Sequence, residues 1–366
     1  MPGRIVLFGA TGYTGRLVAA ALVDRGARSV LAGRNPDTLA ALSEELGGGL
    51  ETQTADVSDP SSVRALVERG DVLLSTVGPF NKWGEPAIEA AIDAGAHYID
   101  STGEPPFIRR VFEDWGPRAK ASGSGLLTAF GWDYVPGNLA GALALENAGE
   151  LATKVAVGYF VSGGGGDMRE AMSGGTAASA AGVVFDRGVA FRDGRIQGER
   201  PAKRVRSFDW QGKNLMGMSL GASEHYALPR LHSNVRDVDV YLGWFGPASR
   251  PLQAVSLMNE VPGVRPALKW ALGRVTKGSS GGPDAESRAK SGSRIIAEAS
   301  DASGNILSRV LVEGPNGYTF TGDILAWGAQ RVAAGALKGA GALGPADGFG
   351  LRELEAGCAE IGMKRI

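Results

Sequence analysis

The sequence is poor in the side chains on which many catalytic centres depend. Among 366 residues it has one cysteine, Cys358, and three histidines. A single cysteine excludes a disulfide framework and a cysteine-ligated zinc site, and it is typical of a reducing compartment. We expect Cys358 to be a small buried side chain. We predict no metal centre, because His225 and His232 are the only imidazoles close in sequence.

An excess of charge and a long apolar run are also missing. The formal net charge is −1, so no basic surface is expected to hold nucleic acid or an anionic membrane. No segment reaches the roughly 18 uncharged apolar residues that a membrane span requires. The first apolar run, residues 4–8, has no basic-then-apolar leader before it. We therefore expect a cytoplasmic protein without a transmembrane segment.

The proton-donating pair of short-chain reductases is absent as well. Those enzymes use a tyrosine with a lysine four positions later, and none of the seven tyrosines here has one. Tyr134, for example, is followed at that distance by Asn138, and Tyr226 by Arg230. The sequence therefore excludes this route of carbonyl reduction.

Short apolar runs alternate with helical patterns over the first third of the chain, which predicts a parallel sheet with crossover helices. Asn35 before Pro36 and Asp59 before Pro60 each place a capping side chain ahead of a proline at the first helical position. We predict a doubly wound α/β Rossmann domain over residues 1–129, with ligands at the carboxyl ends of its strands. The expected strands are 4–8, 29–33, 51–55, 72–76, 97–100 and 125–129.

The pattern changes after residue 130. Apolar residues alternate with others around Val157 and Val240, which predicts antiparallel strands with one covered face. Residues 291–300 and 306–313 are expected to form a hairpin. We predict a second, α+β domain over residues 130–317, with a mostly antiparallel sheet that serves substrate binding and dimerisation. Helices are expected over residues 318–366.

A glycine-rich loop directly follows the first expected strand and precedes the apolar helical run 17–22. Glycine here allows a tight turn, lets backbone amides approach a pyrophosphate, and lets the helix pack against the strand. The loop is therefore predicted to bind a dinucleotide. Its candidate residues are Gly9, Thr11, Gly12, Tyr13, Thr14 and Gly15.

The end of the second strand should select between NAD and NADP. An acid there binds the ribose diol, whereas an arginine accepts the 2′-phosphate. This position holds Arg34 and no carboxylate, so NADP(H) is the predicted cofactor. Asp56, after the third strand, is interpreted either as an adenine contact or as a turn former.

The fourth and fifth strands supply further candidates. The fourth ends in Thr76, Val77, Gly78, Pro79 and Phe80, where we expect the nicotinamide ribose. The fifth ends in residues 100–104, whose polar groups, including Glu104, would lie at the same edge or simply form a turn.

Several motifs resemble those of the saccharopine dehydrogenase-like NADP-binding family. The resemblance is strongest before residue 140, and two later elements resemble the branch that contains trans-acting enoyl reductases and saccharopine dehydrogenase-like oxidoreductases. It implies a Rossmann domain, an α+β substrate domain and a C-terminal helix that returns to the first domain. Tyr134 stands where many relatives have serine, a departure from the pattern. The motifs are 77–80, 84–86, 94–95, 98–105, 131–136, 174–179, 282–283, Glu286 and Arg288.

These observations predict an NADPH-dependent reductase that delivers a hydride to a C=C or C=N bond of a small or carrier-bound metabolite. A carbonyl reductase and a non-catalytic NADP-binding sensor or scaffold remain alternatives. Asp133, Tyr134, Glu104 and Lys82 are the candidate catalytic residues, with Asp133 alternatively a helix cap. Residues 251–275 are interpreted as a core helix, a dimer helix or an apolar substrate entrance. We expect a homodimer.

Overall fold

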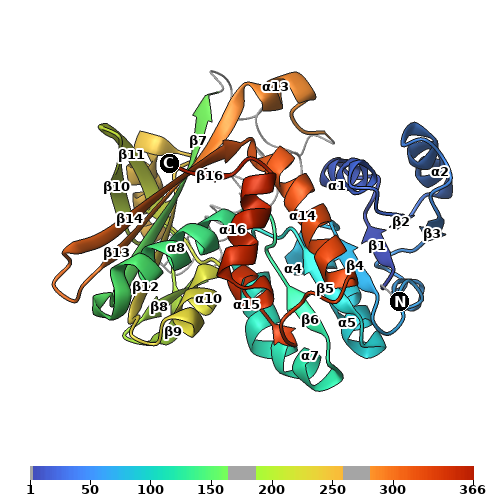
Figure 1. Ribbon diagram of the computed structural model, residues 1–366, viewed down its shortest axis with the longest axis horizontal. Helices are drawn as coiled ribbons and strands as arrows, with labels where there is room; N and C mark the ends of the chain where they lie inside the picture. The colour runs from blue at the N-terminus through green and yellow to red at the C-terminus, as the bar shows by residue number, and fades with distance from the viewer. Residues whose placement is uncertain (1–2, 164–186, 259–280) are drawn as a thin grey trace. The chain divides into compact units, whose positions relative to one another are not determined.

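The computed structural model describes residues 3–163, 187–258 and 281–366 (Figure 1). The chain forms two compact units and passes between them several times. Residues 103–109 belong to the second unit, although the sequence pattern places them within the first domain. The first unit comprises Met1–Thr102, Arg110–Val135 and Gly317–Ile361; the second comprises Gly103–Arg109, Pro136–Asn316 and Gly362–Ile366.

A seven-stranded parallel sheet forms the centre of the first unit, in the order β15-β6-β5-β4-β1-β2-β3. This order is that of a Rossmann sheet with one added strand, which confirms the predicted fold class. The added strand, β15, comes from the C-terminal part of the chain, and its two residues give no strand pattern of their own. The strands are β1 (Ile5–Phe8), β2 (Ser29–Gly33), β3 (Thr52–Thr54), β4 (Val72–Ser75), β5 (His97–Asp100), β6 (Gly125–Leu127) and β15 (Gly341–Ala342).

The helices of this unit begin where the capping side chains predict. Asn35 Oδ1 accepts hydrogen bonds from the amides of Asp37 and Thr38 at 2.9 and 3.2 Å, and Asp59 Oδ1 accepts one from Ser61 at 3.1 Å. The helices are α1 (Tyr13–Asp24), α2 (Pro36–Glu45), α3 (Pro60–Arg64), α4 (Phe80–Trp83), α5 (Glu85–Ala94), α7 (Gly116–Ser122), α14 (Gly317–Ala333), α15 (Pro345–Phe349) and α16 (Leu351–Glu360). Helix α6 (Pro105–Arg110), most of which belongs to the second unit, leads into a π-helical turn of the first unit, Val111–Trp115.

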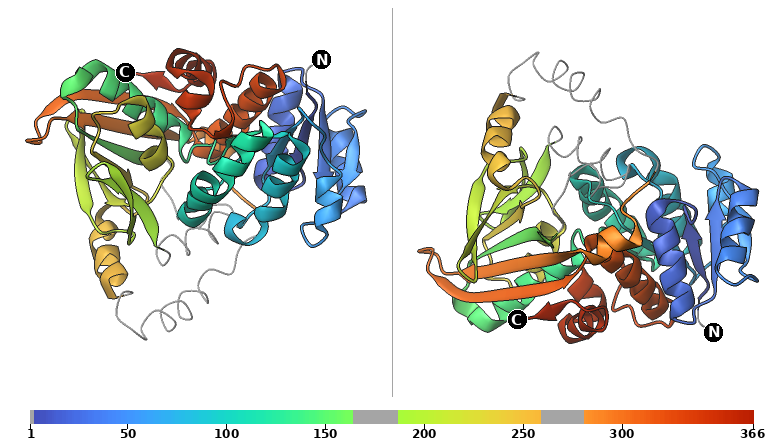
Figure 2. Two further views of the ribbon diagram at one scale, coloured as in Figure 1. Left: turned by 90° about the horizontal axis from the view of Figure 1, so that it is seen from below. Right: turned by 90° about the horizontal axis from the view of Figure 1, so that it is seen from above.

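Helices α1 and α14 lie side by side and run in the same direction (Figures 1 and 2). Tyr13 and Tyr318, near their two N-termini, pack edge to face with ring centroids 5.2 Å apart. Towards their C-terminal ends, the Gln330 amide donates to the Arg25 carbonyl at 3.1 Å. Both N-termini therefore lie at the carboxyl edge of the sheet.

A mixed sheet organises the second unit, in the order β10-β11-β12-β7-β13-β14-β16, with β8 and β9 joined at β12. The predicted hairpin is present as β13 and β14. Strand β7 pairs antiparallel with β13 but parallel with β12, so the expectation that both alternating segments pair antiparallel is wrong for that pair. The strands are β7 (Lys154–Gly163), β8 (Gly188–Arg192), β9 (Arg195–Glu199), β10 (Val205–Trp210), β11 (Lys213–Ser219), β12 (Asp237–Leu242), β13 (Ser291–Ser300), β14 (Ile306–Pro315) and β16 (Lys364–Arg365).

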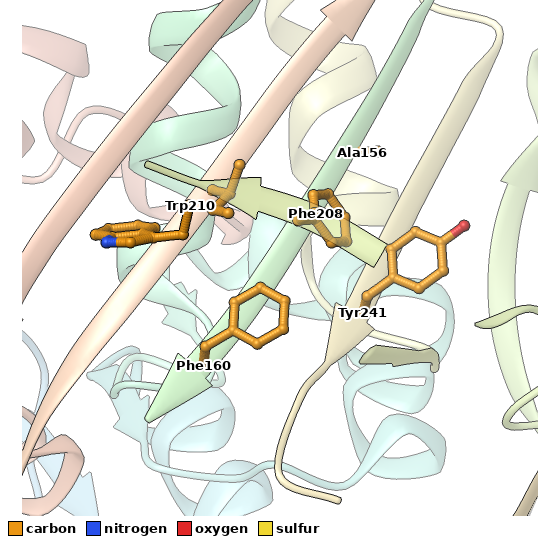
Figure 3. Packing of buried hydrophobic residues seen from close by; sticks show 6 residues of the cluster. Ala156, Phe160, Phe208, Trp210 and Tyr241 are labelled. Atoms are coloured by element: carbon orange, nitrogen blue, oxygen red, sulfur yellow. The ribbon is translucent and has the colours of Figure 1, made fainter. Parts of the chain in front are cut away.

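Both faces of β7 are covered, whereas the alternation predicts one covered face. Helices α8 (Val135–Ala148) and α10 (Glu224–Leu231) cover one face; a Cβ on Gly141 of α8 would lie 2.7 Å from Leu228. On the other face Phe160 of β7 packs against Phe208 of β10, with ring centroids 5.8 Å apart (Figure 3). Because β10 is three strands from β7 in the sheet, this contact means that the β10–β11 end curls over the face.

Of residues 251–275, only the first eight are described. Helix α11 (Ser249–Met258) buries Ser256 and exposes Leu257 and Met258. The resemblance motif 174–179 lies outside the described residues. Within the described ranges no helix is both long enough and apolar enough to span a membrane.

Candidate functional site

The three glycines of the loop after β1 are explained by different structural features. Gly9 has a φ of +89°, and a Cβ there would lie 2.8 Å from Thr76 Oγ1. A Cβ on Gly15 would lie 2.1 Å from the Gly9 carbonyl oxygen. The chain's own turn and packing therefore require glycine at both positions.

Gly12 is different because its backbone conformation suits any residue and a Cβ there would meet one atom within 4 Å, at a tight distance. Its φ is −72°, and a Cβ would have the Gly9 carbonyl oxygen, at 3.3 Å, as its nearest neighbour. Gly12 is the N-cap of α1, a position where serine, threonine or aspartate usually satisfies a first-turn amide. No side chain caps α1, and its first turn has no acid. This arrangement fits an external anion such as a dinucleotide pyrophosphate at the N-terminus of α1.

Arg34 follows β2 as an exposed side chain. Within the described residues its guanidinium makes no hydrogen bond or ion pair, so its donors are available to a ligand phosphate. Asp56, after the neighbouring β3, accepts hydrogen bonds from the Ser58 amide and hydroxyl at 2.8 and 2.7 Å. These bonds, together with the charge of Arg34, hold the pKa of Asp56 below its usual range. Asp56 thus forms a local turn close to Arg34.

The end of β4 holds the glycine loop in place. The Thr76 hydroxyl lies 3.1 Å from the Gly9 carbonyl oxygen and 3.3 Å from that of Phe8, and it can donate to either. Val77 is half-buried beside the loop, the Gly78–Pro79 peptide is cis, and Phe80 is buried at the start of α4. Four adjacent strands, β3-β2-β1-β4, therefore carry the predicted cofactor residues to one sheet edge.

A buried carboxylate joins the ends of β5 and β6. Asp100 Oδ1 accepts hydrogen bonds from the amides of Thr102 and Ala129, each at 2.9 Å, and Oδ2 accepts one from the Thr128 hydroxyl at 2.8 Å. Burial raises the pKa of Asp100 to about 6 although these hydrogen bonds act in the opposite direction. Asp100 therefore fixes the start of the loop that leaves β6.

Asp133 lies on that loop, six residues beyond the end of β6. The residue is half-buried, and its Oδ1 is fully buried without a hydrogen-bond partner among the described residues. It does not cap α8, so the cap interpretation is wrong. Burial alone raises the pKa of Asp133 to about 7. A carboxyl group with this pKa is about half protonated near pH 7, so it can donate a proton there.

The other catalytic candidates have different surroundings. Tyr134 is 1% exposed, and its amide donates to the Ala129 carbonyl at 2.8 Å. Glu104 is buried and belongs to the second unit. Lys82 is exposed on α4, with its Nζ 4.4 Å from the centre of the Trp83 ring. The Asp133 carboxyl thus has the raised pKa that a general acid needs near neutral pH.

Sequence reasoning missed the residues that support this site from a distance. The Thr321 hydroxyl of α14 accepts a hydrogen bond from the Trp132 amide at 3.0 Å, across 189 positions of sequence. Asp100 was visible only as one of several polar residues at a strand end. A local pattern carries no signal for either contact, because the partners meet only in the folded unit.

Comparison with known proteins agrees with this geometry. Residues 5–124 match the family model of the saccharopine dehydrogenase NADP-binding domain. A Mycobacterium tuberculosis protein provisionally named trans-acting enoyl reductase is 38% identical over 185 residues, covering 48% of this chain and 42% of that relative. The trans-acting enoyl reductase of Mycobacterium ulcerans is 37% identical over 141 residues, covering 37% of this chain and 34% of its own. The chain thus spans less than half the length of these curated relatives.

Two solved structures share the fold over the whole chain. Apo saccharopine dehydrogenase (L-Glu forming) of Saccharomyces cerevisiae superposes with a TM-score of 0.61 at 12% identity, covering 100% of this chain and 99% of the other. The homospermidine synthase of Legionella pneumophila, solved in complex with NAD, superposes with a TM-score of 0.62 at 11% identity, covering 100% and 91%. These likenesses establish the architecture of both units.

Proposed function

We propose that this protein is an NADPH-dependent reductase with Asp133 as its proton donor, because residues 5–124 match the family model of the saccharopine dehydrogenase NADP-binding domain. The acceptor is a C=C or C=N bond of a small or carrier-bound metabolite. The observation that carries the proposal is the buried Oδ1 of Asp133, which has no hydrogen-bond partner among the described residues and lies beyond the carboxyl end of the sheet that bears the glycine loop. The relatives named trans-acting enoyl reductase favour the C=C case.

The cofactor would be held by residues of four neighbouring strand ends. The amides at the start of α1 and the absence of a side chain at Gly12 suit the pyrophosphate, and Arg34 suits the 2′-phosphate. Thr76 holds the loop against β4. When bound, NADPH supplies the hydride, with its two electrons, to the acceptor carbon.

Asp133 completes the reduction by supplying the proton. As the acceptor carbon gains the hydride, negative charge develops on an imine nitrogen or, in an enoyl compound, at the α-carbon and carbonyl oxygen. Protonated Asp133 donates its proton to that nitrogen or α-carbon and becomes a carboxylate. Solvent then reprotonates it, and the net reaction consumes one NADPH and one proton for each bond reduced.

Oxidation of NADPH, followed by absorbance with enoyl thioesters, cyclic imines and ketones, tests the activity. We expect turnover with one of the first two classes, and Asp133→Asn should lower kcat by about 10²- to 10⁴-fold without changing NADPH affinity. Loss of turnover in Tyr134→Phe but not in Asp133→Asn would assign the donor role to Tyr134. Tight NADPH binding without turnover of any class would favour a sensor or scaffold.

A further inference from the structure

The loop that carries Asp133 is closed on itself and anchored to the sheet on one side. The Tyr134 amide donates to the Ala129 carbonyl at 2.8 Å, and the Val135 amide donates to the Gly131 carbonyl at 2.9 Å. On the β5 side, the Ala129 amide donates to the Asp100 side chain. Asp100 also accepts from the Phe130 amide through its backbone carbonyl, at 2.8 Å. These bonds fix residues 129 and 130 and hold the Asp133–Tyr134 peptide through the Tyr134 amide, but none of them involves the Trp132 amide or the Asp133 side chain.

Helix α14 packs closely against the other side of the loop. A Cβ on Gly328 would lie 2.6 Å from the Phe130 ring, and a Cβ on Gly317 would lie 3.1 Å from the Trp132 ring. Between these two contacts, a Cβ on Gly131 would lie 3.0 Å from the Thr321 side chain. The loop therefore packs along α14 from residue 130 to residue 132.

On the α14 side, Thr321 bonds to the peptide that precedes Trp132. Its Oγ1 accepts from the Trp132 amide at 3.0 Å and donates to the Gly317 carbonyl at 2.7 Å, so the direction of the hydroxyl is defined by two partners. The Trp132 amide is one peptide unit from Asp133, and turning that peptide would move the Asp133 carboxyl. We propose that Thr321, on the C-terminal helix α14, is a positioning residue for Asp133.

This inference rests on the proposed role of Asp133 as proton donor, but its main consequence can be measured without turnover. Burial is the single cause that raises the pKa of Asp133, with no charged group of the described residues contributing. If the Trp132 peptide loses its anchor, water gains access to the carboxyl, and the pKa should fall towards the ordinary aspartate value. A purely structural role of Thr321 would lower stability without moving this pKa.

The test compares Thr321→Val, which keeps the shape and removes the hydroxyl, with Thr321→Ser, which restores it. Thr319→Val is the matched control, because Thr319 lies in the same turn, half-buried, with no side-chain hydrogen bond within the described residues. Carboxyl ¹³C NMR of the full chain, with the Asp133 signal assigned through Asp133→Asn, gives the pKa in each variant. Thr321→Ala replaces Thr321→Val if the latter does not fold.

We expect the pKa of Asp133 to fall by at least one unit in Thr321→Val and to stay at the wild-type value in Thr321→Ser and Thr319→Val. With a working substrate, kcat should fall about 10- to 100-fold in Thr321→Val, with NADPH affinity retained. An unchanged Asp133 pKa in both Thr321→Val and Thr321→Ala, or an equal fall in Thr319→Val, would overturn the proposal. Full turnover in Asp133→Asn would instead refute the proposed donor, so the two failures can be distinguished.

Discussion

Asp133→Asn should change the pH dependence of stability in a direction set by the burial of the carboxyl. In the unfolded chain the pKa of Asp133 is near 3.8, whereas burial raises it to about 7 in the folded protein. Between these values the folded state binds one more proton than the unfolded state, so the free energy of unfolding falls as pH rises. Asparagine has no such titration. We therefore expect the variant to gain stability relative to the wild type from pH 4 to pH 8.

The size of this gain follows from the separation of the two pKa values. At 1.36 kcal/mol per pKa unit, the interval from 3.8 to about 7 corresponds to at most about 4 kcal/mol. Burying an asparagine amide without a partner costs about 1–3 kcal/mol at every pH. The variant should therefore be close to or below wild-type stability at pH 4 to 5, and about 1–3 kcal/mol more stable at pH 8.

Urea unfolding at a series of pH values measures the difference in unfolding free energy between wild type and Asp133→Asn. Asp59→Asn is the control, because its stability difference should change with pH in the opposite direction. Hydrogen bonds from Ser61 hold the pKa of the exposed Asp59 below its usual range. The stabilisation from Asp59 is present above its unfolded pKa and is lost as pH falls through its folded pKa. A flat difference between wild type and Asp133→Asn from pH 5 to pH 8 would refute the assignment of Asp133 as a buried acid.

Three further measurements test the cofactor site. Gly12→Ser should change the melting temperature little, because serine is a favoured N-cap but its Cβ would lie 3.3 Å from the Gly9 carbonyl oxygen, while NADPH binding should weaken at least 10-fold in a fluorescence titration; unchanged affinity would contradict a pyrophosphate site at Gly12. Gly15→Ala should unfold or strongly destabilise the protein, since its Cβ would lie 2.1 Å from the Gly9 carbonyl oxygen, and a normal melting temperature would contradict this. Arg34→Ala should weaken NADPH binding by about 1.5–3 kcal/mol and leave NADH binding unchanged. The matched variant Arg28→Ala, an exposed arginine at the opposite end of β2, should affect neither, and an equal loss in both would remove the role of Arg34.

Features predicted correctly from the sequence are those with a local physical cause. Asn35 and Asp59 mark helix starts because a capping oxygen bonds to amides two or three residues later. The buried parallel strands appear as short apolar runs because helices cover both faces of such a sheet. The glycine loop is recognisable because its turn, its ligand approach and its helix packing act within seven residues.

The sequence was less informative wherever the partner lies far along the chain. Strand β15 has two residues and exists as a strand because it pairs with β6. The parallel pairing of β7 with β12, and the curl that brings Phe208 over Phe160, depend on which strands become neighbours. Alternation shows which side chains share a face, but it does not show what covers that face.

For Asp133, the sequence determined some properties and the tertiary structure determined others. The sequence alone determined that an aspartate follows the sixth strand at the carboxyl edge of a dinucleotide-binding sheet, because strand order and glycine spacing are local signals. Tertiary structure decided that this aspartate caps no helix and that its Oδ1 is buried without a hydrogen-bond partner among the described residues. Asp100 anchors Ala129 on the same loop, and α14 places Thr321 against that loop from 189 positions beyond Trp132. Desolvation depends on everything that packs around a carboxyl, and no short stretch of sequence contains that information.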